Sequence, residues 1–263
     1  MSLIRTSIES NVARIVLCRS DKRNALSRQL LTELNSAVTD ALNNPQTRVL
    51  VLEAEGSVFC AGMDLGEMQQ RATSENGREE WQKDSKDYCE LLISLYSATV
   101  PTIAVLQGPV LAGGVGMILA CDFVIAAEGA FVSLPEPQRG ITAAMVTPLL
   151  VHRVGAGPAA ALLLSGDRMT VTRAQQLGMI YQVVNGEDLD GTAQQLATSI
   201  MKGSPQALAT TKQHVDRIAG GNMAEKLRDS IEVSAAARAT DDAREGLAAF
   251  LEKRAPGWQT SDS

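Results

Sequence analysis

The order of apolar and amphipathic segments along the chain predicts an α/β protein. Residues 3–7 and 12–19 are short apolar segments on either side of a turn, and they predict two strands. Apolar residues then recur every four positions across 26–42, which places them on one face of a helix, and Ser27 is the predicted N-cap. Three continuous apolar runs predict buried parallel strands at 48–54, 102–107 and 122–127.

Helical patterns dominate the second half of the chain. A helix is predicted across 77–97, and a glycine-rich turn at 108–116 leads into an apolar helix that ends near Cys121. The next predicted elements are helices at 142–154, 158–164 and 172–177 and a strand at 181–184. Because the pattern becomes long and amphipathic near residue 200, we predict a core of 1–200 and a helical C-terminal region of 201–263. That region would cover the core or pack on a neighbouring subunit.

Composition and charge limit the kind of protein. With 45% hydrophobic and 21% charged residues in a chain of 263, there is ample apolar material for a core. A net charge of −6 argues against nucleic-acid binding, which needs a basic surface. No apolar run reaches the ~20 residues of a membrane span, and the N-terminus lacks the apolar stretch of a signal peptide. The four cysteines form no CxxC or metal-ligand spacing. We therefore expect a cytoplasmic protein with reduced thiols and no metal, nucleic-acid or membrane partner.

Three segments carry candidate chemistry, and the first is SVFCAGMDL at 57–65, directly after a predicted buried strand. Gly62 lies there between apolar residues, where backbone N–H groups could polarise a bound carbonyl. A turn that needs glycine for a positive φ explains the same residues, and that structural interpretation is the more common one.

The second segment is QGPVLAGGVG at 107–116, which runs from a buried strand into an apolar helix. Free N–H groups and the dipole at a helix start favour negative charge, and the missing side chains of Gly113 and Gly114 let a substrate reach the backbone. The segment is neither a Walker motif nor a GxGxxG fingerprint. Close packing of the helix on the strand is an equally good explanation.

The third segment is SLPEPQRG at 133–140, in which Glu136 stands between two prolines among small and apolar residues. A carboxylate in such a rigid, water-poor setting would have a raised pKa and could serve in proton transfer. Taken alone, the segment is more simply a surface loop whose acid pairs with Arg139.

Other titratable side chains indicate no specific chemistry. Glu67 and the charged run at 78–87 are interpreted as a solvated helix face rather than as the lining of a pocket. His152 and His214 fall on predicted helices away from the three segments, and we interpret both as structural.

Together the segments resemble, in order and in spacing, the signature motifs of the crotonase superfamily, the enoyl-CoA hydratase/isomerase family. RNALS at 23–27 resembles the family's early segment near the CoA pantetheine, and FCAGMDL its A-G-x-D-L motif. AGGVGMILACD resembles the G-G-G-x-x-L-x-x-x-C-D segment, and SLPE the following x-x-P-E. The similarity continues through 164–184 and the terminal EGLAAFLEKRAPGW, so it covers essentially the whole chain. It implies a spiral core of repeated ββα units with a helical C-terminal region, assembled as a homotrimer or a dimer of trimers.

The resemblance also implies site residues. In the family the thioester oxygen accepts hydrogen bonds from two backbone N–H groups, which match Cys60 and Gly113, so the Cys60 sulfur need not take part. Glu136 matches the proton-transferring glutamate, and Gly114 and Gly116 match the substrate pocket. The implied CoA contacts are Arg23, Ala25, Leu26, Ala61, Gly62, Asp64 and Leu65. Arg23 is equally well explained as a solvated surface arginine. Coenzyme A would enter as part of the acyl-CoA substrate, with no separate cofactor.

One position departs from the family pattern. Well-known enoyl-CoA hydratases carry two glutamates, and the first of them falls on Gly116, which has no side chain. Double-bond isomerases of the family use only the carboxylate that matches Glu136. Some hydratases of branched, glutaconyl-type thioesters also carry glycine at the first position, and segment 140–155 resembles those members. We therefore expect an enoyl-CoA hydratase, with a delta-isomerase as one alternative and a non-catalytic acyl-CoA-binding protein as another.

Overall fold

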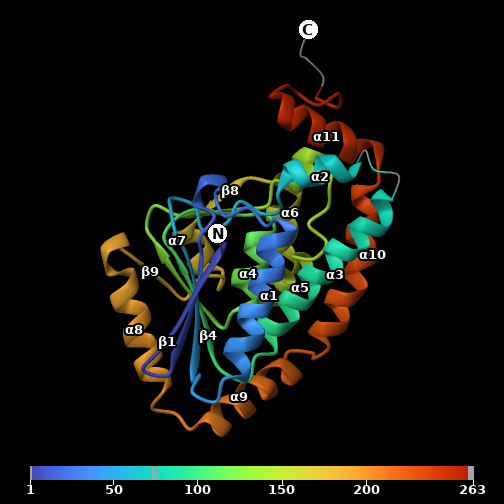
Figure 1. The fold of residues 1–263 in the computed structure, drawn as a ribbon. Helices are drawn as coiled ribbons and strands as arrows, with labels where there is room; N and C mark the ends of the chain where they lie inside the picture. Colours follow the sequence, from blue (N-terminus) through green and yellow to red (C-terminus); the bar gives the residue numbers. More distant parts are fainter. Residues whose placement is uncertain (1, 73, 75, 260–263) are drawn as a thin grey trace.

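A six-stranded sheet forms the centre of the computed structural model, which describes residues 2–72, 74 and 76–259 (Figure 1). In spatial order its strands are β1 (Ile4–Glu9), β2 (Val12–Leu17), β3 (Val49–Ala54), β4 (Thr102–Leu106), β6 (Phe123–Ala127) and β9 (Gln182–Val184). β1 pairs antiparallel with β2, and the other neighbours are parallel. A second sheet holds β5 (Val110–Leu111), β7 (Phe131–Ser133) and β8 (Arg168–Thr170).

Successive segments of the chain alternate between these two sheets. β4 joins the large sheet, β5 joins the small one, and helix α4 (Gly113–Ala120) follows. β6 and β7 repeat the same step. This repeat of two strands and a helix is the ββα spiral expected from the sequence, and the α/β fold class is confirmed.

Helices bury both faces of the large sheet. In β3, Val49 and Val51 pack in one apolar cluster with α8 (Leu189–Ile200), while Leu50 and Leu52 pack in the main core. The main core includes α1 (Arg28–Asn43), α3 (Gly77–Tyr96) and α4, which Figure 1 shows on the side opposite α8. Strands buried on both faces read as continuous apolar runs, which is why β3, β4 and β6 are recognisable in the sequence.

Helix α1 forms where the four-residue spacing places it. Its buried face includes Leu30, Leu34 and Val38, all without exposed surface. The Ser27 hydroxyl accepts a hydrogen bond from the Leu30 N–H at 3.2 Å, which confirms the predicted N-cap.

The C-terminal region is helical, as expected, and it packs against the middle of the chain. Its helices are α9 (Pro205–Ile218), α10 (Met223–Arg238) and α11 (Asp241–Glu252). α10 lies along α3, whereas α11 packs on α2 (Leu65–Ala72) and on the 3-10 turn Glu136–Arg139 (Figure 1). No helix in the described ranges has the length and apolarity needed to cross a membrane.

Several element boundaries differ from the prediction. The helix predicted to begin at Thr142 begins at Thr147 as α5 (Thr147–Val154), because residues 142–143 are irregular and 144–146 form a buried turn. The remaining helices are α6 (Ala156–Ser165) and α7 (Val171–Gln176), with 3-10 turns at Ser20–Lys22 and Gly186–Asp188. Helix α2 and the short strands β5, β7 and β8 are absent from the sequence-based prediction.

Candidate active site

Two loops that follow strands of the large sheet run side by side and form one wall of the site. Cys60, after β3, makes a parallel bridge with Val110, after β4, and the Leu111 N–H donates to the Cys60 carbonyl at 2.9 Å. Gly114 packs on the same residue, so closely that a Cβ there would lie 2.8 Å from the Cys60 Cβ. The fold therefore brings the first two sequence segments together.

Neither predicted oxyanion donor makes a hydrogen bond through its N–H in the described residues, although only Gly113 lines the pocket and Cys60 is fully buried. By contrast, the neighbouring Phe59 N–H donates to Pro109 at 2.9 Å. Ala112, just before Gly113, has φ 50° and ψ −126°, a conformation that costs a non-glycine residue about 1–3 kcal/mol. This strained turn starts α4 and places Gly113 in the pocket wall.

The Cys60 side chain is not suited to nucleophilic chemistry. Its thiol is fully buried, and the loss of hydration raises its pKa to about 12. The thiol therefore stays protonated at neutral pH. This agrees with a role for the Cys60 backbone N–H rather than its sulfur.

Glu136 is a buried carboxylate at the start of the 3-10 turn Glu136–Arg139. It is 6% exposed, and burial raises its pKa to about 7, against the smaller opposing effects of Arg139 and Arg238. The Oε2 atom has no hydrogen-bond partner in the part of the chain that the structure describes. Arg139 does not pair with it, because its guanidinium lies 4.3 Å over the Phe250 ring. The interpretation of Glu136 as a surface acid paired with Arg139 is therefore wrong.

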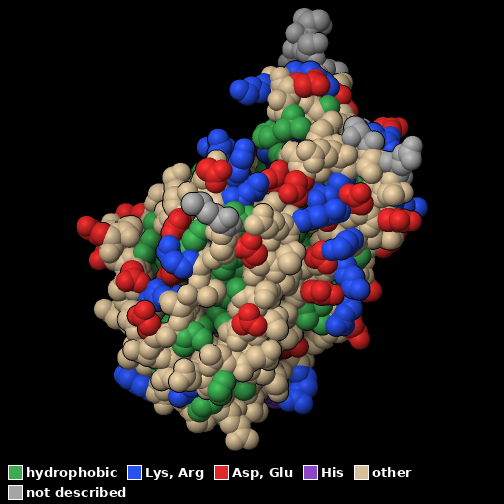
Figure 2. Space-filling model, viewed as in Figure 1, with side chains coloured by type: hydrophobic (Ala, Val, Ile, Leu, Met, Phe, Trp, Pro, Cys, Tyr) green, Lys and Arg blue, Asp and Glu red, His purple; other side chains and the backbone are tan. Residues whose placement is uncertain are grey.

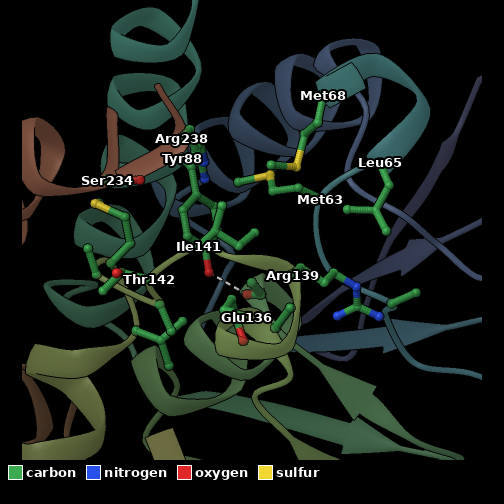
Figure 3. A pocket seen from close by; sticks show the side chains of 17 residues that line it. Met63, Leu65, Met68, Tyr88, Glu136, Arg139, Ile141, Thr142, Ser234 and Arg238 are labelled. Atoms are coloured by element: carbon green, nitrogen blue, oxygen red, sulfur yellow. Dashed lines mark hydrogen bonds between the residues drawn. The ribbon is translucent and has the colours of Figure 1, made fainter. Parts of the chain in front are cut away.

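Gly113 and Glu136 line one pocket, and Figure 3 shows the Glu136 side chain in it. The cavity itself is small, about 50 Å³, and the empty space among its lining residues is about 570 Å³ when the open mouth is included. Its apolar wall comes from α2 and its flanks and from segment 141–146. Its polar side chains are Tyr88, Glu136, Arg139, Thr142, Ser234 and Arg238.

The expected CoA-binding residues lie in two adjoining segments. The Leu26 N–H donates to Gly62 O at 2.8 Å, and the Asp64 N–H donates to Leu26 O at 3.1 Å. Ala61 and Leu65 line the pocket itself. These contacts place the RNALS segment beside FCAGMDL, at one end of the pocket.

The side chains of these two segments have different surroundings. Arg23 is exposed and has no ion pair among the described residues, while Ala25 is partly buried. Asp64 pairs with Arg19 at 2.7 Å and accepts hydrogen bonds from Gly66 and Glu67 at the start of α2. Asp64 thus has structural partners already, whereas Arg23 is available for an anion.

Gly114 and Gly116, expected in the substrate pocket, lie one layer behind its wall. Both are buried, but neither belongs to the pocket lining. Gly114 packs on Cys60, and Gly116 packs against the hydroxyl end of Tyr88. Their expected role as lining residues is corrected to a role in close packing, because α4 begins at Gly113 and turns its next residues inward.

Among the lining residues that were not identified from sequence are three polar ones: Tyr88 from α3, and Ser234 and Arg238 from α10. Arg238 donates to the Ser85 hydroxyl at 3.0 Å and lies over the Trp81 ring. A buried aromatic residue in an amphipathic helix gives no sequence signal of a site, and α10 meets α3 only through tertiary packing. No local pattern could have found them.

The charged run of α3 is only partly solvated. Figure 2 shows acidic and basic side chains side by side over this helix. Asp84, however, is 7% exposed in its side chain and pairs with Arg28 at 2.6 Å and Arg71 at 3.0 Å. The expected solvated face therefore holds a buried ion-pair network beneath its outer charges, next to the pocket residue Arg238.

The two histidines lie on helices, as expected. His152 on α5 contacts the Tyr96 ring edge to face, with ring centroids 5.9 Å apart, and His214 is on α9. Neither belongs to the pocket that holds Glu136.

Comparisons with known proteins agree with the geometry. Residues 7–261 match the family model "Enoyl-CoA hydratase/isomerase". A putative enoyl-CoA hydratase of Thermus thermophilus is 33% identical over 94% of this chain and 97% of the relative. The 2,3-dehydroadipyl-CoA hydratase of Escherichia coli is 32% identical, with 98% and 99% covered. The crystal structure of a putative enoyl-CoA hydratase from Mycobacterium avium paratuberculosis superposes with a TM-score of 0.86 at 31% identity, covering 98% of this chain and 100% of that one. The chain belongs to the enoyl-CoA hydratase/isomerase family.

Proposed function

We propose that this protein is an enoyl-CoA hydratase that adds water across the C2=C3 double bond of an acyl-CoA thioester, with Glu136 as its only acid–base group. One observation carries the proposal. A buried carboxylate with a pKa of about 7 shares a pocket with the free N–H of Gly113. Such a carboxylate can both take and return a proton near neutral pH.

In the proposed complex the thioester oxygen accepts hydrogen bonds from the N–H groups of Cys60 and Gly113. The acyl group lies against the apolar wall of the pocket. The CoA portion follows the adjoining segments, with contacts from Arg23, Ala25, Leu26, Ala61, Gly62 and Leu65. Arg23 would pair with a phosphate as a charge-assisted contact. Asp64 holds the start of α2 in place rather than contacting CoA.

The reaction balances with one carboxylate. Glu136 accepts a proton from water as the water oxygen bonds to C3, and the electron pair of the double bond moves to give an enolate on the thioester oxygen. Cys60 N–H and Gly113 N–H stabilise that oxygen without reorganising, and losing one such donor typically costs about 10²–10³ in rate. Glu136 then returns the proton to C2. The net change is the addition of one water, so we propose no metal or redox cofactor.

The alternative is a delta-isomerase, in which Glu136 moves a proton between C2 and C4. The absence of a second carboxylate at Gly116 is the observation in its favour. The names of the relatives favour hydration. A protein that only binds acyl-CoA is disfavoured by the retained Glu136 and the two free N–H donors.

The test is mass analysis of thioesters incubated with the protein in deuterated buffer. The panel holds crotonyl-CoA, a 3-enoyl-CoA and 3-methylglutaconyl-CoA. We expect a gain of one water that is lost in Glu136→Gln. Double-bond migration without water gain would instead establish the isomerase. Near-full turnover by Glu136→Gln would overturn the role of Glu136.

The assembly and location of the protein are part of the same proposal. We propose a cytoplasmic homotrimer or dimer of trimers, on the basis of the family resemblance. Sedimentation velocity separates these from a monomer.

A further inference from the structure

We propose that the Tyr88 hydroxyl holds the attacking water. This hydroxyl occupies the space that a side chain at position 116 would fill. The inference rests on the proposed hydratase function and supplies what that function lacks. A single carboxylate can accept a proton from water, but it orients the water through only one hydrogen bond.

Tyr88 and Gly116 occupy one another's space. A Cβ atom on Gly116 would overlap the Tyr88 hydroxyl oxygen and would lie 3.4 Å from its Cζ. Even the smallest side chain at position 116 would therefore displace the phenol. Gly116 therefore has two effects: the site has no carboxylate at this position, and the Tyr88 side chain has room to lie there.

The hydroxyl of Tyr88 is fixed and faces the pocket. The side chain is 1% exposed, comes from the middle of α3 and lines the same pocket as Glu136. Its O–H donates to the carbonyl of Gly113, the residue whose N–H is a proposed oxyanion donor. Figure 3 shows this hydrogen bond beside the Glu136 carboxylate.

This arrangement defines what the phenol can do. Its only hydrogen is committed to Gly113, so the remaining lone pairs of its oxygen can only accept a hydrogen bond. Burial raises the pKa of Tyr88 well above 10, so the phenol stays neutral and does not act as a base. A hydrogen of a bound water is the donor that fits it.

A water between Tyr88 and Glu136 would be held by both of its hydrogens. One points to Glu136 Oε2, which has no other partner in the described part of the structure, and is the proton that is transferred. The other points to the Tyr88 oxygen and stays on the water. The water's own lone pair is then directed at C3, which is the orientation that hydration requires.

The test separates water addition from proton transfer, and Tyr88→Phe keeps the ring while removing the hydroxyl. Two rates are measured for wild type and variant: hydration of the best enoyl-CoA, and deuterium exchange at C2 of the matching saturated acyl-CoA. Exchange needs Glu136 and the oxyanion donors but no attacking water. We expect hydration to fall about 100-fold, the typical effect of a misplaced reactant, while exchange stays within about 3-fold.

Two further variants serve as controls. Gly116→Ala should displace the phenol and give the same split between the two rates. Tyr96→Phe removes a comparable hydroxyl, which donates to Asp216 at 2.7 Å outside the pocket, and should change neither rate.

The outcomes distinguish the two proposals. Hydration by Tyr88→Phe at the wild-type rate, or an equal loss of hydration and exchange in both Tyr88→Phe and Gly116→Ala, would overturn the role of Tyr88 and leave the hydratase standing. A wild-type protein that exchanges C2 protons but hydrates no thioester would overturn the hydratase, and the water-holding role with it.

Discussion

Gly62 and Ala112 lie so close together that a Cβ atom on Gly62 would be 2.5 Å from the Ala112 Cβ. Gly62 also has φ 87°, a conformation that L side chains rarely adopt. Ala112 is itself strained and directly precedes the Gly113 N–H. The spacing of the two loops that carry the oxyanion donors is therefore set by the absence of one methyl group.

Gly62→Ala should damage both stability and catalysis. The added methyl must push the two loops apart in an already strained turn, so we expect a loss of about 3 kcal/mol in the free energy of unfolding. The rate constant kcat should fall more than KM rises, because the donors act on the transition state. Urea denaturation and steady-state kinetics measure these effects. Gly157→Ala is the matched control, since a Cβ there meets nothing within 4 Å. Equal behaviour of the two variants would contradict this account of the wall.

Activity should depend on the ionisation of Glu136. The carboxylate must be charged to accept a proton from water, so kcat/KM should rise with pH up to about 7 and then level off. Arg238 favours the charged form of Glu136, so Arg238→Met should move this acidic limb to higher pH. Arg78→Met, at a surface ion pair with Glu232, should leave the limb unchanged. A rate that is constant from pH 5.5 to pH 8.5 would exclude Glu136 as the titrating base.

The same raised pKa should lower stability as the pH rises from mildly acidic to neutral. An unfolded glutamate titrates near pH 4.3, whereas Glu136 in the folded protein titrates at about 7. Below both values the charge state does not affect folding. As pH rises through this window, the unfolded chain loses its proton while Glu136 in the folded protein keeps it, so about 3 kcal/mol of stability is lost by the time both are ionised.

Glu136→Gln removes that loss. The variant should be more stable than wild type by about 3 kcal/mol at pH 8 and within about 1 kcal/mol of it at pH 5, measured by urea unfolding. Glu79→Gln, exposed on α3, should show no such crossover. A variant that is less stable than wild type at pH 8 would refute the buried-carboxylate interpretation.

Asp84 should be a main determinant of the packing beside the pocket. Removing one member of a buried ion-pair network leaves its partners uncompensated, here Arg28 and Arg71. Asp84→Ala should therefore cost about 3–5 kcal/mol in the free energy of unfolding. Asp87→Ala, which breaks a more exposed pair with Lys83, should cost at most about 1 kcal/mol. Thermal and urea unfolding of the two variants compare these costs.

The sequence predicts the parts of the fold that local pattern determines. The strands at 49–54, 102–106 and 123–127 can be predicted from the sequence because burial on both faces makes each a continuous apolar run. The short strands Val110–Leu111 and Arg168–Thr170 cannot be predicted in this way, because a strand of two or three residues is defined by the strand it pairs with rather than by its own composition.

The same distinction applies to the site. Glu136 and the glycine-rich loop are found from sequence because each lies in a contiguous motif. Tyr88 and Arg238 are not, since they enter the pocket from helices whose mutual packing no local pattern encodes. Gly116 shows both what the sequence reveals and what it does not. Its identity excludes a carboxylate at this position, but only the fold shows that the Tyr88 phenol lies in the space that a side chain would fill.

The pairing of α10 with α3 has a consequence for how the enzyme matures. Ser234 and Arg238, which close the pocket over Tyr88, are made long after the residues that they cover. A nascent chain on the ribosome can assemble both sheets while this side of the pocket is still open to water and the Glu136–Arg139 turn still lacks α11. Competence for acyl-CoA chemistry should thus appear only on release of the finished polypeptide.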